Sequence, residues 1–246
     1  MGNNSRREAA AALKKQQAAE DRRKKILFGT VAGIAVLLIG GLIALGIYLN
    51  RPEELKVVQP EASTTDDYGL VVGDGSTQVD LYVDYQCPVC KSFEDANGDK
   101  IETWVDDGDI TLNLHILNFL DTKLNKEFSS RAGNAAIYAL QESGDPVEFL
   151  DYSKKIFDNQ PPEGSGETLT NDQLVALGKD FEFGSAFEDG VRDETYAGWI
   201  AEGTDTTFDK GDVTGTPTVF IDGTKVQREQ MNDFQTLVQK AIDGSE

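Results

Sequence analysis

The sequence predicts an α/β domain with a helical insertion, preceded by a single transmembrane helix. Two observations predict the domain. Short runs with the alternating apolar pattern of strands are separated by segments with helical spacing, and a long helical block interrupts this order late in the chain. A third observation predicts the membrane helix, because an uncharged apolar run of 24 residues lies near the N-terminus.

The N-terminal fifth of the chain, residues 1–49, has the pattern of a membrane anchor. Residues 1–25 are basic and end in "RRKK", whereas residues 26–49 contain no charged side chain. This run is long enough to span a bilayer and exceeds the apolar part of a cleaved signal peptide, typically about 7 to 15 residues. Because Lys and Arg favour the cytoplasmic side, we expect residues 1–25 to be cytoplasmic and the rest to be extracytoplasmic, in the cell membrane. Residues 50–67 read as a linker, and residues 68–246 as one domain.

The charge of the chain limits its partners. Its 43 acidic and 23 basic residues give a net charge of −20, and many of the basic residues lie before the apolar run. The domain that follows is therefore strongly acidic. This charge excludes nucleic acid as a partner, because a polyanion would be repelled.

The strands of the domain are predicted by alternation and by turn residues. The predicted strand segments are "YGLVVG" (68–73), "VDLYVDY" (79–85), "ITLNLHIL" (110–117) and "PTVFIDG" (217–223). The second and third are separated by a helix, which predicts parallel pairing through a right-handed crossover. The fourth ends in Asp222-Gly223 and is followed by "KVQ", which predicts an antiparallel hairpin on the same sheet.

The helices are predicted by spacing and by end signals. Apolar residues from Phe128 to Leu140 share one face, and Gly144 follows as a stop signal. Thr170 and Gln173 form a capping-box pattern. Apolar residues from Met231 to Ala241 predict a last amphipathic helix. The tryptophans and the segment "FEFGSAF" are expected to pack in the core or the insertion.

The two cysteines of the chain, Cys87 and Cys90, form the motif CPVC directly after a predicted strand. A structural zinc site needs four ligands, and the chain offers two cysteines and one histidine, with nothing in the sequence to place carboxylates beside them. A disulfide across two residues closes too small a loop to stabilise the fold much. A redox pair is the interpretation that fits best.

The position of the cysteines favours redox chemistry. Pro88 suits the first position of a helix, so Cys87 is expected at the N-cap and Cys90 one turn along. A thiolate at a helix N-terminus gains about 0.3 to 1 kcal/mol from the dipole, which lowers its pKa. Cys90 is expected to be less exposed and to resolve mixed disulfides. Thr216-Pro217 has two interpretations: a plain strand opener, or a cis peptide bond packed against the cysteine pair.

The motifs "YVDYQCPVC", "NFLD", "SSRAGNAA" and "VTGTPTVFIDG", in this order, resemble the DsbA-like branch of the thioredoxin superfamily, and most of all its membrane-anchored bacterial members. The resemblance implies a thioredoxin fold with a helical insertion at about 124–208. It implies that Cys87 attacks, that Cys90 resolves and that Pro217 is cis. It also implies that the backbone of Thr216 binds an extended substrate, with Val89 beside it.

The motif departs from the best-known oxidants of the family, which have CPHC. Val89 cannot add the positive charge that histidine brings to the thiolate, so we expect a less acidic Cys87 and a milder oxidant. The buried acid that thioredoxins usually keep six positions before the first cysteine is replaced by Leu81. Asp84 is interpreted either as a proton acceptor for Cys90 or as a carboxylate at the mouth of the site. His115, the only histidine, is expected to be a hydrogen-bonded structural residue rather than a catalytic one.

These observations predict a membrane-tethered thiol-disulfide oxidoreductase that introduces disulfides into exported proteins with free thiols. The resemblance implies that a quinone-linked membrane partner of the DsbB or vitamin K epoxide reductase (VKOR) type reoxidises it. No metal and no organic cofactor are expected. Two alternatives remain: an extracytoplasmic reductase or isomerase, and a non-catalytic module that binds peptides in the envelope.

Overall fold

The computed structural model describes residues 55–61, 63–64 and 67–244. The predicted cytoplasmic segment 1–25 and the predicted transmembrane helix 26–49 lie outside the described residues, as do residues 50–54, 62, 65 and 66 of the predicted linker 50–67. Within the described part of the chain, no helix is both long and apolar enough to cross a bilayer.

A five-stranded mixed sheet forms the centre of the domain, with strand order β1-β3-β2-β4-β5. The strands are β1 (Leu70–Val72), β2 (Thr77–Val83), β3 (Ile110–Ile116), β4 (Thr218–Ile221) and β5 (Thr224–Lys225). As predicted, β2 and β3 are parallel and are linked by helix α2 (Pro88–Asp106). The predicted parallel pair with a helical crossover is thereby confirmed.

The predicted hairpin is also present. β4 pairs antiparallel with both β2 and β5, and the β4–β5 turn has positive φ at Asp222 (47°) and Gly223 (74°). Positive φ at both central residues is what a two-residue hairpin turn needs, and Asp-Gly tolerates it. This hairpin carries the Thr216-Pro217 loop to the end of β2.

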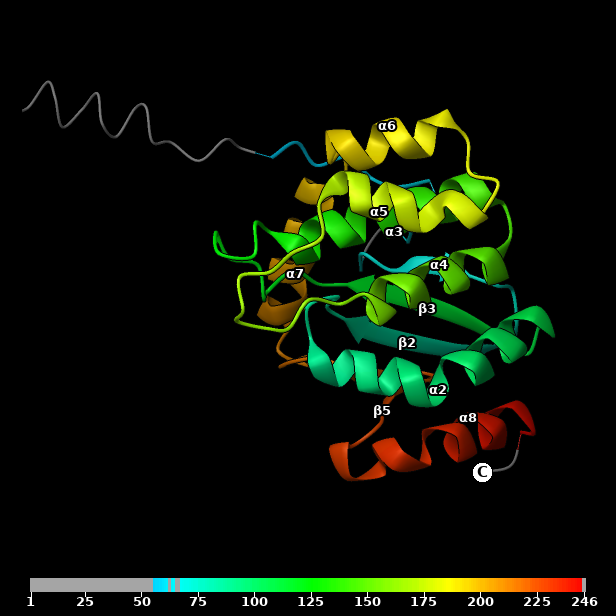
Figure 1. Cartoon of the computed structure of the whole chain (residues 1–246). Coiled ribbons are helices and arrows are strands. Elements are labelled where there is room, and N and C mark those ends of the chain that lie inside the picture. The colour runs from blue at the N-terminus through cyan, green and yellow to red at the C-terminus, as the bar shows by residue number, and fades with distance from the viewer. Residues whose placement is uncertain (1–54, 62, 65–66, 245–246) are drawn as a thin grey trace, which may run out of the picture. The chain divides into compact units, whose positions relative to one another are not determined.

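The insertion lies between β3 and β4 and consists of helices. They are α3 (Phe128–Ser143), α4 (Pro146–Asp158), α5 (Asn171–Leu177), the 3-10 helix η1 (Gly178–Asp180), α6 (Ser185–Asp193) and α7 (Ala197–Lys210). The predicted bounds of about 124–208 agree with this block. In Figure 1, α3 to α6 gather above β2 and β3, and α8 (Phe234–Ile242) lies on the opposite, lower side.

Local sequence signals explain several helix ends. α3 ends at Gly144, whose φ of 62° is left-handed and suits glycine. Both hydrogen bonds of the predicted capping box between Thr170 and Gln173 are present. The last helical region is divided: a 3-10 helix η2 (Arg228–Asp233) precedes α8 (Phe234–Ile242). The prediction of one continuous helix from Met231 was therefore wrong, because Met231 belongs to η2.

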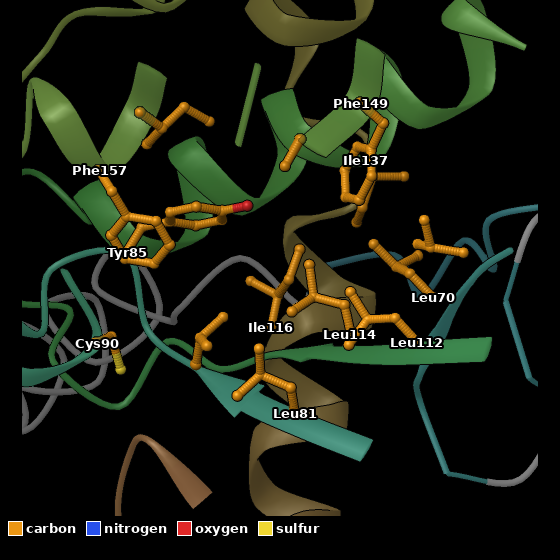
Figure 2. Packing of buried hydrophobic residues seen from close by; sticks show 14 of the residues in the cluster. Leu70, Leu81, Tyr85, Cys90, Leu112, Leu114, Ile116, Ile137, Phe149 and Phe157 are labelled. Atoms are coloured by element: carbon orange, nitrogen blue, oxygen red, sulfur yellow. The ribbon is translucent and has the colours of Figure 1, made fainter. Parts of the chain in front are cut away.

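The core between the sheet and the insertion follows the alternation of the strands. Figure 2 shows Leu81 of β2 and Leu114 and Ile116 of β3 pointing toward the helices that carry Ile137 and Phe149. All five side chains are buried. Alternate residues of a strand point to opposite faces, so the intervening positions of β2 and β3 face the other way.

The motif "SSRAGNAA" lies in α3, and its glycine is required by packing. A Cβ atom at Gly133 would lie 2.7 Å from Ile116 of β3 and 2.9 Å from Ile200 of α7. A side chain there would push the helix away from the sheet. The small residue therefore brings α3 close to β3 and, as described below, close to the residues that follow β2.

The aromatic segment "FEFGSAF" packs within the insertion, as predicted. Phe181, Phe183 and Phe187 each contact the ring of Tyr152 of α4 at centroid distances of 5.4 to 6.1 Å. Such edge-to-face pairs stabilise an aromatic cluster beyond the burial of its area.

Candidate redox site at the start of helix α2

The two cysteines lie where the sequence predicts them. Cys87 is the N-cap of α2 with an extended backbone, Pro88 occupies the first helical position, and Cys90 lies one turn along. Both sulfur atoms belong to free thiols. Cys90 is 1 % exposed and Cys87 is 7 % exposed, so Cys87, which is predicted to attack, is the more accessible of the two.

The Thr216-Pro217 loop lies against the cysteine pair. The peptide bond between these residues is cis, and the Cys87 thiol donates a hydrogen bond of 3.6 Å to the carbonyl oxygen of Thr216. The two residues are 129 positions apart in the chain. The interpretation of Pro217 as a cis proline beside the cysteines is therefore confirmed, and the plain strand opener is excluded.

The site lowers the pKa of Cys87 to about 5. The main cause is the Cys90 thiol, which donates a hydrogen bond to the Cys87 sulfur. Burial raises the pKa of Cys87, whereas hydrogen bonds with Thr216 and with the backbone amides of Val89 and Cys90 lower it further. The predicted direction is confirmed, but the main cause is the neighbouring thiol rather than the start of the helix. Burial raises the pKa of Cys90, and its hydrogen bond to the Cys87 sulfur adds to this rise.

A groove of about 890 Å³ opens beside the cysteines. Its walls come from the first turns of α2, the Thr216-Pro217 loop, the end of the hairpin and η2. Val89 lies at the groove and is 60 % exposed; its contact with a substrate stays a prediction. Lys225 and Arg228 also line the groove, so part of it is basic although the chain is acidic.

Asp84 lies three residues before Cys87 but faces the insertion. Its carboxylate accepts hydrogen bonds from the Ser129 hydroxyl (2.6 Å), the Gln86 amide (2.8 Å) and the Leu120 amide (3.1 Å). The side chain is fully buried, so its placement at the mouth of the site was wrong. Burial raises the pKa of Asp84 to about 7, and the three hydrogen bonds oppose this rise. The carboxylate thus joins the residues after β2 to the start of α3.

Asp121 of the motif "NFLD" makes a second connection at the same helix end. Its carboxylate accepts hydrogen bonds from the backbone amides of Ser129 (2.7 Å) and Ser130 (3.1 Å) in the first turn of α3. A carboxylate at a helix N-terminus satisfies amides that have no partner inside the helix. The two motifs "NFLD" and "SSRAGNAA" therefore connect the insertion to the sheet through the same set of hydrogen bonds.

Two glutamines hold the loop before Cys87 and were not singled out by the sequence. The side chain of Gln160, after α4, donates to the carbonyl oxygens of Tyr85 (2.8 Å) and Cys87 (3.0 Å). Gln86 donates in return to the carbonyl oxygen of Pro161 (2.6 Å). The only signal in the sequence is the position of Gln86 inside the motif, and nothing local marks Gln160.

His115 takes no part in the cysteine site. It is buried, its Nδ1 lies 3.1 Å from the carbonyl oxygen of Asp67, and its ring stacks on Tyr82 at a centroid distance of 4.0 Å. The prediction of a structural, hydrogen-bonded histidine agrees with these contacts at one of its two nitrogens.

The fold and the site agree with known proteins. A family model described as Thioredoxin matches residues 65–240. The chain belongs to the thioredoxin family. A crystal structure of reduced DsbA from Mycobacterium tuberculosis is similar, with a TM-score of 0.59 and 26 % identity over 79 % of this chain and 90 % of that chain. The predicted resemblance to DsbA-like thiol-disulfide oxidoreductases is confirmed.

Two relatives show how much of the chain such matches cover. Disulfide bond formation protein D of Bacillus subtilis is 24 % identical over 177 residues, 70 % of this chain and 75 % of that protein. Serine/threonine-protein kinase PknE of Mycobacterium tuberculosis is 32 % identical over 114 residues, 44 % of this chain. That match spans only 20 % of the kinase.

Proposed function

We propose that this protein is a membrane-tethered thiol-disulfide oxidoreductase that introduces disulfides into exported proteins through the Cys87–Cys90 pair. The observation that carries the proposal is the pairing of an acidic thiol with a buried one. Cys87, with a pKa of about 5, lies beside the Thr216-Pro217 loop, and Cys90 lies behind it with a raised pKa.

The proposed reaction begins with the oxidised pair. A substrate thiolate attacks the Cys87 sulfur, the Cys87–Cys90 bond breaks, and Cys90 leaves and takes up a proton. A second substrate thiolate then attacks the substrate sulfur of the mixed disulfide, and Cys87 leaves as a thiolate. The substrate gains one disulfide, and the enzyme gains the two electrons as a dithiol. A leaving thiol of low pKa departs faster, so the lowered pKa of Cys87 favours the second step.

The groove supplies a place for the substrate chain. An extended segment bound along Thr216 would put its own cysteine next to Cys87, which is the more exposed sulfur of the pair. Val89 offers an apolar contact, whereas Lys225 and Arg228 favour acidic residues near the substrate cysteine. The groove therefore favours substrates that are unfolded or loosely folded around the cysteine.

The location and the partner of the enzyme are proposed from the sequence. The apolar run 26–49 with its basic flank supports a single-pass anchor in the cell membrane with the catalytic domain outside. An oxidase needs an acceptor for the electrons it collects. A quinone-linked membrane protein of the DsbB or VKOR type would meet this need next to the anchor.

Trapping the redox state of the pair in cells tests the direction of the reaction. Cells are quenched with acid, free thiols are alkylated, and the modified forms are separated by size. A mainly oxidised pair supports the oxidase. A mainly reduced pair would instead support the reductase or isomerase, and a Cys87→Ser variant that keeps full function in cells would support a non-catalytic binding module.

A further inference from the structure

A second cluster of chemically reactive side chains lies away from the cysteines, on the sheet. Asp80 of β2 and His115 of β3 meet Asp67, which lies just before β1. One donor atom of each residue, two carboxylate oxygens and an imidazole nitrogen, lies within 4.8 Å of the other two. This is a ligand set of the kind that holds divalent transition-metal ions.

The buried nitrogen of His115 is the observation that distinguishes this cluster from an ordinary group of acids. His115 is 1 % exposed, and its Nε2 has no hydrogen-bond partner among the residues that the structure describes. Nε2 faces the Asp80 carboxylate at 3.7 Å, too far for a hydrogen bond. A buried polar atom without a partner is costly, so a nitrogen that faces a carboxylate in such a cluster points to a bound cation.

The other ring nitrogen of His115, Nδ1, has a hydrogen-bond partner that fixes where the proton lies. Nδ1 lies 3.1 Å from the backbone carbonyl oxygen of Asp67, which can only accept, so Nδ1 carries the proton. Nε2 is then the ring nitrogen left to bind a metal ion in the cluster. Histidines that bind metal usually donate their other ring nitrogen to a carbonyl or carboxylate in this way.

The carboxylates are oriented as well. The side-chain amide of Asn113 donates to the Asp80 carboxylate at 3.1 Å, and the Thr64 hydroxyl donates to the carboxylate of Asp67. The ring of Tyr82 stacks on His115 and fixes its plane. Side chains outside the ligand set thus fix all three ligands, as in natural metal sites.

The geometry points to a divalent transition-metal site, formed by Asp67, Asp80 and His115, that takes an ion of the Zn²⁺ type with a water molecule as its fourth ligand. Ligand atoms of a tetrahedral zinc ion lie about 3.3 Å apart, since zinc bonds to nitrogen and oxygen are about 2.0 to 2.2 Å long. Small movements of the half-buried aspartates would bring the three donors to that spacing. Calcium fits less well, because it takes six to eight oxygen ligands.

A metal ion here would fasten the beginning of the domain to its central strands. Asp67 belongs to a turn in which the Thr64 amide donates to the Gly69 carbonyl at 2.8 Å, and β1 follows at once. β2 and β3 are neighbours in the middle of the sheet. No metal was expected from the sequence, because the three ligands come from separate segments with no shared motif.

The site is tested with Zn²⁺ on the purified full chain in detergent. The cysteines are first oxidised, and the absence of free thiols is checked, because a reduced CPVC pair also binds zinc. Equilibrium dialysis then measures the zinc bound per chain. We expect about one ion in the wild type, and an affinity at least about tenfold weaker in Asp80→Asn and His115→Gln. Asp74→Asn, an exposed acid outside the cluster, is the matched control and should bind as the wild type does.

Nitrogen NMR of the imidazole gives a second readout that does not depend on a variant. His115 is the only histidine, so a single pair of ring nitrogen signals reports on the site. Zinc should move the Nε2 signal and leave Nδ1 protonated. The proposal is overturned if zinc leaves the signals unchanged, if Asp80→Asn binds as tightly as Asp74→Asn, or if the imidazole is doubly protonated at neutral pH and excludes zinc.

Discussion

The turn from Asp84 to Cys87 carries an ionisable side chain at each end, and the two ends face different parts of the molecule. The pKa values of these two side chains shift in opposite directions. Both side chains are buried. The pKa of Cys87 falls to about 5, whereas the pKa of Asp84 rises to about 7. Cys87 faces the groove and the Thr216 loop, and Asp84 faces the start of α3.

The difference shows that burial alone does not decide the charge of a group. At Cys87 the Cys90 thiol, the Thr216 side chain and backbone amides together outweigh burial and stabilise the thiolate. At Asp84 three hydrogen bonds are present, yet the loss of water around a full carboxylate outweighs them. One end of the turn is thereby suited to reaction with a substrate, and the other to connecting the insertion with the sheet.

Removing the sulfur of Cys87 should have the largest effect. We expect Cys87→Ser to lower the rate of thiol oxidation in a model peptide by at least about a thousandfold, since a serine hydroxyl cannot form a mixed disulfide. Cys90→Ala should instead accumulate covalent complexes with substrates. Thermal unfolding of both variants provides the control for folding. A Cys87→Ser protein that still oxidises the peptide would contradict the assignment of the attacking residue.

Removing the Cys90 thiol also tests the main cause of the low pKa of Cys87. In Cys90→Ala the pKa of Cys87 should rise by about one unit or more, because the principal hydrogen bond to the thiolate is lost; one unit corresponds to about 1.4 kcal/mol. The rate of alkylation of the single cysteine, followed against pH, measures it. An unchanged pKa would mean that the backbone amides at the helix start and Thr216 are sufficient to lower the pKa of Cys87.

Asp84, at the other end of the turn, should control the stability of the fold rather than its redox chemistry. Because the pKa of Asp84 is raised from 3.8 to about 7 on folding, its contribution to stability is complete below about pH 4 and is lost as the pH rises to about 7. The free energy of unfolding should fall by a few kcal/mol across this window. Asp84→Asn should flatten that dependence in urea unfolding curves.

The matched control for this variant is Asp74→Asn, which changes an exposed acid and should keep the wild-type pH dependence. If Asp84→Asn and the wild type lose stability in parallel between pH 4 and pH 7, Asp84 is not the group responsible. The redox potential of Asp84→Asn should stay close to that of the wild type, since its carboxylate bonds to Ser129, Gln86 and Leu120.

The smallest effect is expected at Val89. A histidine at this position adds positive charge beside the thiolate, so Val89→His should lower the pKa of Cys87 further, by a fraction of a unit to about one unit, and make the pair more oxidising. Equilibrium with a glutathione redox buffer measures the potential. No change, or a more reducing potential, would contradict the idea that valine makes this pair a milder oxidant.

The features that were predictable from the sequence are those with a local or a family signal. Alternation located β2 and β3, Pro88 located the start of α2, and Asp222-Gly223 located the hairpin turn. The cis bond before Pro217 came from the resemblance, because a proline before a strand has an ordinary interpretation as well.

The features that were not predictable depend on contacts between distant segments. Nothing near Gln160 indicates that it holds the carbonyl groups of Tyr85 and Cys87. The direction of the Asp84 side chain depends on α3, which lies 45 residues from it at Ser129. Such hydrogen bonds leave no periodic pattern, since each partner is a single polar residue in a different element.

The titration of the reduced wild-type pair tests the central claim most directly, namely that the fold stabilises Cys87 as a thiolate while keeping Cys90 protonated. Thiolate absorbance in the ultraviolet, followed against pH, should show one cysteine titrating with a midpoint near 5 and the second silent up to the pH at which the protein unfolds. Two thiols that titrate together near the ordinary cysteine value of about 8.5 would contradict it.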